Sequence, residues 1–115
     1  MADLRVGTAV DAHRLVVGRP LVLGGVTIPH DRGLEGHSDA DVVCHVLTDA
    51  ILGASGIGDI GRMFPSDAAW KDAASLELLR LACARIAEDG WTLVNADCMV
   101  VAMQPRIAPH VDAMR

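Results

Sequence analysis

The spacing of apolar residues changes along this chain, and the change limits the folds that the chain can adopt. Between Val6 and Val10, apolar residues alternate with other residues, which predicts a half-buried β-strand over residues 4–13. Residues 21–28 predict a second strand, interrupted at Gly24-Gly25, where a bulge or a close backbone approach is expected. The first quarter of the chain is therefore predicted to be rich in strands.

Helical spacing of apolar residues replaces this alternation in the middle of the chain. Ser38 is the predicted N-cap of a helix that runs to about Gly53, and Ser75 is the predicted N-cap of a second helix that ends at Gly90. Residues 91–103 predict a third long strand. Strands followed by two helices and a returning strand favour an α+β fold, with the helices packed on one face of a mixed sheet.

Composition narrows the functions that this fold can serve. A chain of 115 residues forms one domain, and 51% hydrophobic residues is a high share for so small a chain, so we expect apolar surface to be buried between subunits. The net charge of -5 argues against a nucleic-acid partner. Because the chain has neither an apolar run long enough to span a membrane nor a signal sequence, we expect a cytoplasmic protein without a membrane partner. Three widely spaced cysteines fit buried, reduced thiols.

Two short segments carry candidate metal ligands. Asp11 and His13 lie at positions i and i+2 of the first predicted strand, on one face and about 7 Å apart. His45 lies two turns into the first predicted helix. Two imidazoles and one carboxylate form the three-ligand set of a catalytic zinc site with an open fourth position, although satisfied polar residues at element ends would show the same spacing. Asp41, one turn before His45, accepts the free ring N–H of that histidine, or accepts the Ser38 amide as the carboxylate of a capping box, or does both.

The surrounding residues occur in a distinctive order. The segments are Val10-Asp11-Ala12-His13, Leu23-Gly24-Gly25-Val26-Thr27-Ile28-Pro29, Gly36-His37-Ser38-Asp39-Ala40-Asp41, His45, Leu47-Thr48-Asp49-Ala50, Gly58-Asp59-Ile60-Gly61 and Phe64-Pro65. Together they resemble the 2-C-methyl-D-erythritol 2,4-cyclodiphosphate synthase family of the non-mevalonate isoprenoid pathway. The resemblance runs from about Leu4 to the last residue.

The resemblance implies a fold, a reaction and cofactors. Family members are two-layer sandwiches that form homotrimers, with active sites between adjacent subunits. They convert 4-diphosphocytidyl-2-C-methyl-D-erythritol 2-phosphate into 2-C-methyl-D-erythritol 2,4-cyclodiphosphate and CMP. The resemblance implies one Zn²⁺ per active site, held by Asp11, His13 and His45, and a second divalent ion, Mg²⁺ or Mn²⁺, whose glutamate ligand this sequence lacks.

The resemblance also implies substrate-binding residues. His37 corresponds to the residue assigned to transition-state stabilisation, and Arg106 stands where a lysine is common. The loop after Phe64 is one residue shorter than usual, so its acidic contact is left open. The implied substrate-binding residues are Asp11, Ala12, His13, His37, Ser38, Asp59, Ile60, Gly61, Phe64, Pro65, Ser66, Asp67, Ala102, Pro105, Arg106 and Ile107.

The last residues of the sequence predict a helix that is cut short, which affects the activity to be expected. Pro109 predicts a helix start, and the sequence stops less than two turns later at Arg115. We therefore expect residues 1–115 to form a single synthase domain that lacks roughly its last quarter. Two alternatives remain open, a catalytically inactive zinc-binding fragment and a zinc phosphohydrolase. His30 and His110 lack partners at ligand spacing and are interpreted as solvated or structural.

Overall fold

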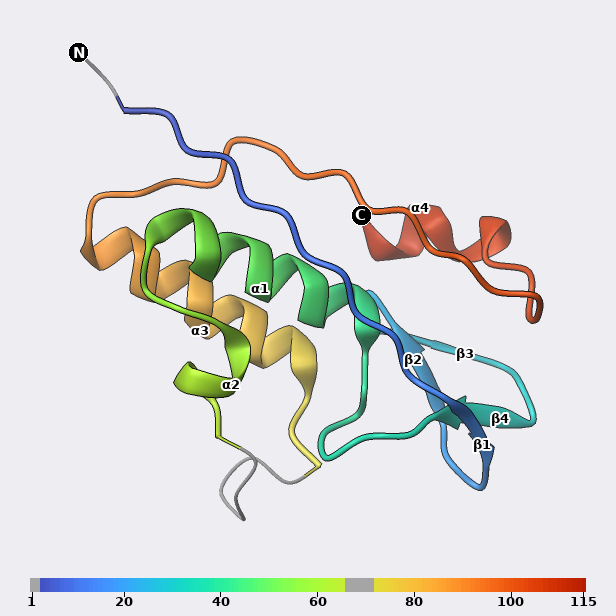
Figure 1. Ribbon diagram of the computed structural model, residues 1–115. Helices are drawn as coiled ribbons and strands as arrows, with labels where there is room; N and C mark the ends of the chain where they lie inside the picture. Colours follow the sequence, from blue (N-terminus) through green and yellow to red (C-terminus); the bar gives the residue numbers. More distant parts are fainter. Residues whose placement is uncertain (1–2, 66–71) are drawn as a thin grey trace.

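Four short strands come first in the fold, and helices follow them (Figure 1). The computed structural model describes residues 3–65 and 72–115. The elements in chain order are β1 (Leu15–Val17), β2 (Leu21–Leu23), β3 (Val26–Ile28), β4 (Arg32–Leu34), α1 (Val42–Ser55), α2 (Ile60–Met63), α3 (Ser75–Glu88), the 3₁₀ turn η1 (Ala108–His110) and α4 (Val111–Met114).

The strands form two antiparallel pairs. β1 pairs with β4, with Leu15 opposite Leu34, and β2 pairs with β3. The single strand predicted over 21–28 is wrong, because Gly24 and Gly25 adopt φ angles of 57° and 76° and make the two-residue turn of a hairpin. The side chains of β2, β3 and β4 pack with Val43 of α1 into the first of two core clusters formed by the described residues.

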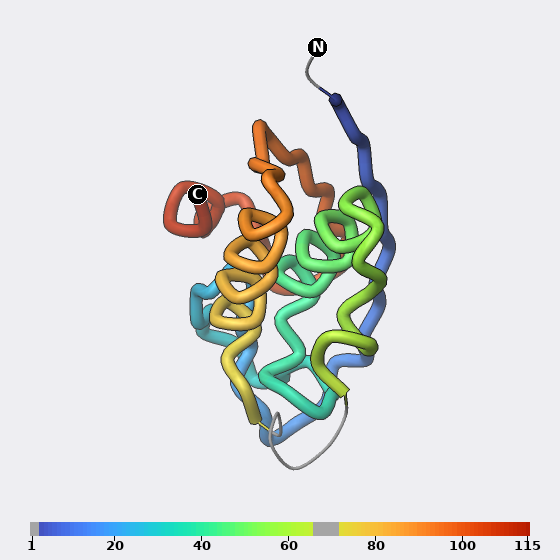
Figure 2. The backbone as a smooth tube through the Cα atoms, turned by 90° about the vertical axis from the view of Figure 1, so that its left-hand side faces the viewer, coloured from blue at the N-terminus to red at the C-terminus, as the bar shows by residue number. Residues whose placement is uncertain are grey.

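α1 and α3 lie side by side and run in the same direction (Figures 1 and 2). Ile51 and Leu52 of α1 pack against Ala82 and Ile86 of α3 in the second core cluster. These residues recur at helical spacing, which places them on facing stripes of the two helices. The predicted helices are therefore confirmed as elements of the fold.

Helix boundaries differ from the prediction by a few residues. α1 begins at Val42 with Asp41 as its N-cap, so the prediction of Ser38 as the cap is wrong. It ends at Ser55, because Gly56 adopts a φ angle of 80° and its N–H bonds back to Leu52 and Gly53. The N-cap of α3 is Ala74 and not Ser75, which is the first helical residue.

Two long extended segments lie beside α1 without joining a sheet. Residues 4–13 and 91–103 were predicted as strands, but within the described part of the chain neither segment forms a β-ladder. Figure 1 shows them on either side of a gap above α1. Side chains from both segments and from α1 line a groove of about 1330 Å³. A strand needs a neighbour to accept its hydrogen bonds, and neither segment pairs with another strand among residues 3–65 and 72–115.

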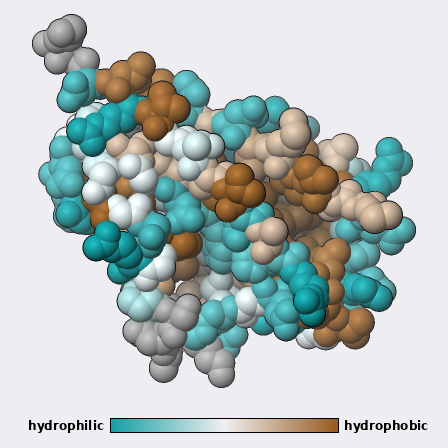
Figure 3. Space-filling view, viewed as in Figure 1, coloured by the Kyte–Doolittle hydropathy of each residue, from teal (hydrophilic) through white to brown (hydrophobic). Residues whose placement is uncertain are grey.

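The rims of this groove are apolar and open. Figure 3 shows exposed apolar side chains along the N-terminal segment and over the face beside it. Val10, Met99 and Val101 are each about nine-tenths exposed. The α+β class is confirmed, while the described strands form two antiparallel pairs and not one mixed sheet. Within the described residues, no helix is both long and apolar enough to cross a membrane.

Candidate metal centre

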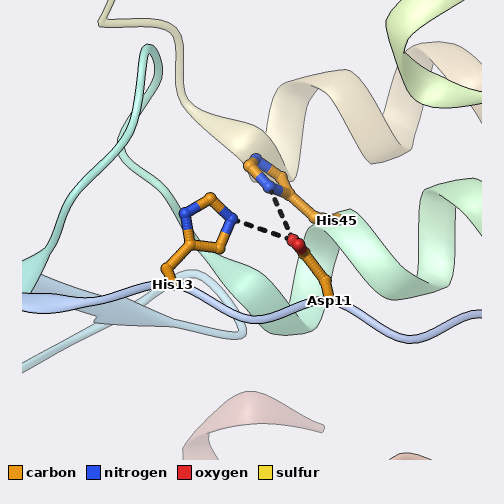
Figure 4. A group of neighbouring side chains, drawn as sticks. All are labelled: Asp11, His13 and His45. Carbon is orange, nitrogen blue, oxygen red and sulfur yellow. Dashed lines mark hydrogen bonds and ion pairs between the residues drawn. The ribbon is translucent and has the colours of Figure 1, made fainter.

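Three predicted ligands converge at the start of α1 (Figure 4). The Oδ2 atom of Asp11 lies 2.9 Å from Nε2 of His13 and 3.3 Å from Nδ1 of His45. The three ligand atoms lie within 4.8 Å of one another, and all three residues are half-buried. The prediction that these residues come together is confirmed.

The local backbone accounts for this convergence. Asp11 and His13 extend from alternate positions of the N-terminal segment, while His45 comes from the first turn of α1. Gly36 leaves room for the His13 ring, because a Cβ atom there would lie 3.4 Å from two ring atoms and 2.8 Å from Cβ of Ala40. A side chain at position 36 would therefore crowd the centre.

The proton of the His13 ring is fixed by a backbone group. Nδ1 of His13 lies 2.7 Å from the carbonyl oxygen of Glu35. A carbonyl oxygen only accepts hydrogen bonds, so Nδ1–H of His13 must donate to it. The opposite nitrogen, Nε2, is then the atom that faces Asp11 and that can bind a cation.

The second nitrogen of His45 faces two hydroxyl groups. Nε2 of His45 lies 2.8 Å from Oγ of Ser75 and 3.1 Å from Oγ of Ser38. Sequence reasoning missed Ser75 in this role and assigned it to helix capping. A serine 30 positions away from the ligand gives no spacing signal, and only the packing of α3 beside α1 brings it here.

Asp41 caps α1 and does not orient His45. Its side chain is fully buried, with Oδ1 accepting the N–H groups of Gly24 and Cys44 and Oδ2 accepting that of Gly25. A capping role for Asp41 is confirmed, although Asp41 is the N-cap residue itself and not the third position of a capping box that begins at Ser38. This carboxylate therefore connects the β2–β3 turn to the first turn of α1.

Cys44, next to the candidate ligand His45, does not belong to the group of described residues that could hold a metal ion. Burial raises the pKa of the Cys44 thiol well above its ordinary range, and the negative charge of Asp41 adds to this shift. The chemistry of the centre therefore rests on one carboxylate and two imidazoles.

The predicted substrate residues near the centre differ in their surroundings. His37 is exposed, whereas Ser38 is buried and its Oγ accepts the N–H of Ala40. Asp59 caps α2 by accepting the N–H of Arg62, and Ile60 donates its N–H to Asp49. Gly61 and Pro65 are exposed, Phe64 is buried, and the predicted contacts Ser66 and Asp67 lie outside the described residues.

The remaining predicted substrate residues lie in the extended C-terminal part. Ala102 and Arg106 are exposed, Pro105 follows a cis peptide bond, and Ile107 packs on the first core cluster. Ala102, Pro105 and Ile107 line the same groove as Asp11, Ala12 and His13. Nε2 of His30 lies 3.5 Å from Oδ1 of Asp31. Within residues 3–65 and 72–115, neither His30 nor His110 belongs to a cluster that could hold a metal.

These features define an α+β protein whose site can hold a divalent metal through two histidines and an aspartate. The sequence pattern of the YgbB family matches residues 4–115. The chain therefore belongs to the YgbB family.

Relatives with known names agree with this assignment. The chain is 59% identical over 114 residues to 2-C-methyl-D-erythritol 2,4-cyclodiphosphate synthase from Laribacter hongkongensis, a match that covers 98% of this chain and 70% of the relative. It is 58% identical over 112 residues to the protein of the same name from Chromobacterium violaceum, covering 96% of this chain and 71% of that protein.

Solved structures show the same fold. A 2C-methyl-D-erythritol-2,4-cyclodiphosphate synthase in a CDP-bound form superimposes with a TM-score of 0.89 at 41% identity, covering 96% of this chain and 74% of that one. The bifunctional IspDF from Campylobacter jejuni gives a TM-score of 0.90 at 44% identity, covering 96% of this chain and 30% of that one.

Proposed function

We propose that this chain acts as a 2-C-methyl-D-erythritol 2,4-cyclodiphosphate synthase in isoprenoid precursor biosynthesis. It would convert 4-diphosphocytidyl-2-C-methyl-D-erythritol 2-phosphate into the cyclic diphosphate and CMP. The observation that carries the proposal is the convergence of Asp11, His13 and His45 in a chain so similar to named synthases.

The reaction suits a site with this composition. An oxygen of the 2-phosphate bonds to the β-phosphorus, and the bond from that phosphorus to the bridging oxygen breaks, so that CMP leaves with this oxygen. Such a transfer needs positioning and charge neutralisation more than a nucleophilic side chain. The ion at the three ligands is proposed to be Zn²⁺, which would orient the diphosphate and neutralise its charge.

The residues around the metal centre receive proposed roles in the same reaction. His37 would stabilise the transition state, and Ser38 would contact a phosphate from its position 3.1 Å from the His45 ring. The sugar would lie against Asp59, Ile60 and Gly61, and Phe64, Pro65, Ser66 and Asp67 would be further substrate contacts. The cytidine would lie against Ala102, Pro105, Arg106 and Ile107.

We also propose a second metal ion, an oligomeric state and a cellular location for this enzyme. A second divalent ion, Mg²⁺ or Mn²⁺, would neutralise further charge on the substrate diphosphate. We propose that residues 1–115 belong to a single synthase domain and that the active enzyme is a homotrimer. Exposed apolar residues such as Val10 and Val101 support burial against other protein. A cytoplasmic location would keep the three cysteines reduced.

The test supplies the protein with Zn²⁺, Mg²⁺ and the substrate, and follows the products by phosphorus NMR and chromatography. Equal amounts of CMP and cyclic diphosphate are expected, and His37→Ala should slow their formation. A linear, hydrolysed product would instead indicate a zinc phosphohydrolase. Zinc binding without release of CMP would indicate a non-catalytic zinc-binding protein.

A further inference from the structure

We propose that Ser75 and Asp39 act as positioning residues that fix the proton of His45 and aim its other ring nitrogen at the metal position. This inference rests on the proposed metal centre and assigns two further residues to it. Neither residue belongs to the metal-binding cluster itself. The structure links them in one chain of hydrogen bonds, from Asp39 through Ser75 to the ring of His45.

The direction of each bond in this chain follows from the groups involved. The Oγ atom of Ser75 is in hydrogen-bond contact with Oδ1 of Asp39. An ionised carboxylate only accepts, so the single hydroxyl hydrogen of Ser75 is donated to Asp39. With that hydrogen committed, Oγ of Ser75 can only accept at its 2.8 Å contact with His45, and Nε2 of His45 must carry the proton.

This proton position determines what His45 presents to Asp11. With the hydrogen on Nε2, the lone pair of Nδ1 points at Oδ2 of Asp11, 3.3 Å away. Two electron-pair donors facing each other at this distance repel unless a proton or a cation lies between them. The ring of His13 is oriented in a similar way by a different group, because the Glu35 carbonyl oxygen accepts the proton on Nδ1 and leaves Nε2 to face Asp11.

Asp39 is held firmly enough to act in this way. Its Oδ2 accepts the backbone N–H of Ser75 at 3.0 Å, and its Oδ1 accepts the N–H of Asp41 at 3.1 Å. Its own N–H donates to the carbonyl oxygen of Ala73 at 3.1 Å. Ser75 is fully buried, so water does not compete for its hydroxyl group. The negative charge of Asp39 would also strengthen His45 as a ligand through the intervening hydroxyl.

The test measures Co²⁺ binding by visible absorption, with Co²⁺ as the spectroscopic probe for the site. Ser75→Ala and Asp39→Asn are each expected to weaken Co²⁺ binding by about 10- to 100-fold, as is usual for partners that orient a ligating histidine. Ser75→Thr, which restores a hydroxyl group, should recover most of the affinity. Ser55→Ala is the matched control, because Ser55 bonds to the Leu52 carbonyl at the far end of α1 and should leave binding unchanged.

Nitrogen-15 NMR of the metal-free protein provides a readout that a merely structural role would not change. In the wild type, Oγ of Ser38 lies 3.3 Å from Oγ of Ser75, to which it can donate its hydrogen. In Ser75→Ala, the Ser38 hydroxyl loses this acceptor and can donate to Nε2 of His45, so the signal of His45 should shift toward the other tautomer while that of His13 stays the same. Adding Ser38→Ala removes the second hydroxyl and checks this explanation. If Ser75→Ala keeps wild-type Co²⁺ affinity and the His45 tautomer, or disturbs both histidines equally, the inference is overturned. If His45→Ala itself binds Co²⁺ normally, the proposed metal centre fails.

Discussion

Replacing Asp41 with alanine should remove a large part of the stability of this fold. The carboxylate accepts three backbone N–H groups, from Gly24 at 2.9 Å, Gly25 at 2.7 Å and Cys44 at 3.1 Å. In doing so it joins the β2–β3 turn to the first turn of α1. Its side chain is fully buried, so it satisfies these donors where water is scarce.

The expected loss can be worked from these three bonds. Each glycine N–H left without its acceptor costs about 1 kcal/mol, since water can reach the turn in part. Loss of the N-cap on Cys44 adds about 1–2 kcal/mol. The free energy of unfolding should therefore fall by about 3–4 kcal/mol, from a total of about 5–15 kcal/mol that is usual for a domain.

Urea denaturation followed by circular dichroism measures this change. Asp59→Ala is the matched control, because Asp59 is the exposed N-cap of α2 and accepts a single N–H, from Arg62. Its replacement should cost about 1 kcal/mol. If Asp41→Ala loses no more stability than Asp59→Ala, the idea that Asp41 fastens the hairpin to the helix is refuted.

Three further outcomes are expected. Alanine at any of the three metal-centre residues should abolish zinc retention by elemental analysis, whereas His30→Ala should retain it; full zinc in His45→Ala would contradict the ligand set. Gly53→Ala should raise the free energy of unfolding, measured by urea denaturation, by about 0.5–1 kcal/mol. Gly53 lies within α1, and the space that a Cβ would occupy there is open. A loss of stability would contradict this expectation. Alkylation at neutral pH should label the exposed Cys98 well before Cys44. Burial shields the Cys44 thiol, and its raised pKa keeps it protonated until the protein unfolds. Equal labelling rates in the native protein would contradict the burial of Cys44.

Sequence patterns predicted the metal centre because its ligands carry local signals. Asp11 and His13 share one face of an extended segment, and His45 follows a turn that leads into a helix. The helices were predictable for a related reason, since the stripes that include Ile51 and Ile86 recur at helical spacing. The helical stripes can be recognised within a few turns of chain, whereas the grouping of Asp11 and His13 with the distant His45 was implied by the resemblance to a known family.

Features that depend on distant segments were not predictable in this way. Alternation near Val6 indicates an extended backbone but does not say whether another strand lies beside it. The two roles considered for Asp41 could be separated only by knowing that the Gly24–Gly25 turn lies against the helix. Ser75 reaches His45 only because α3 runs beside α1. Each of these depends on the packing of one element against another.

The three residues of the metal centre come from parts of the backbone that differ in their hydrogen bonding. Asp11 and His13 lie in a segment without ladder hydrogen bonds to other described residues, whereas His45 lies in a packed helix. Amide hydrogens of residues 3–13 should consequently exchange with solvent far faster than those of α1. A bound divalent cation would close a loop between positions 13 and 45 of the chain, and slower exchange of the N-terminal segment on metal addition would report that closure directly. With a cation bound, the centre would cross-link this N-terminal segment to α1.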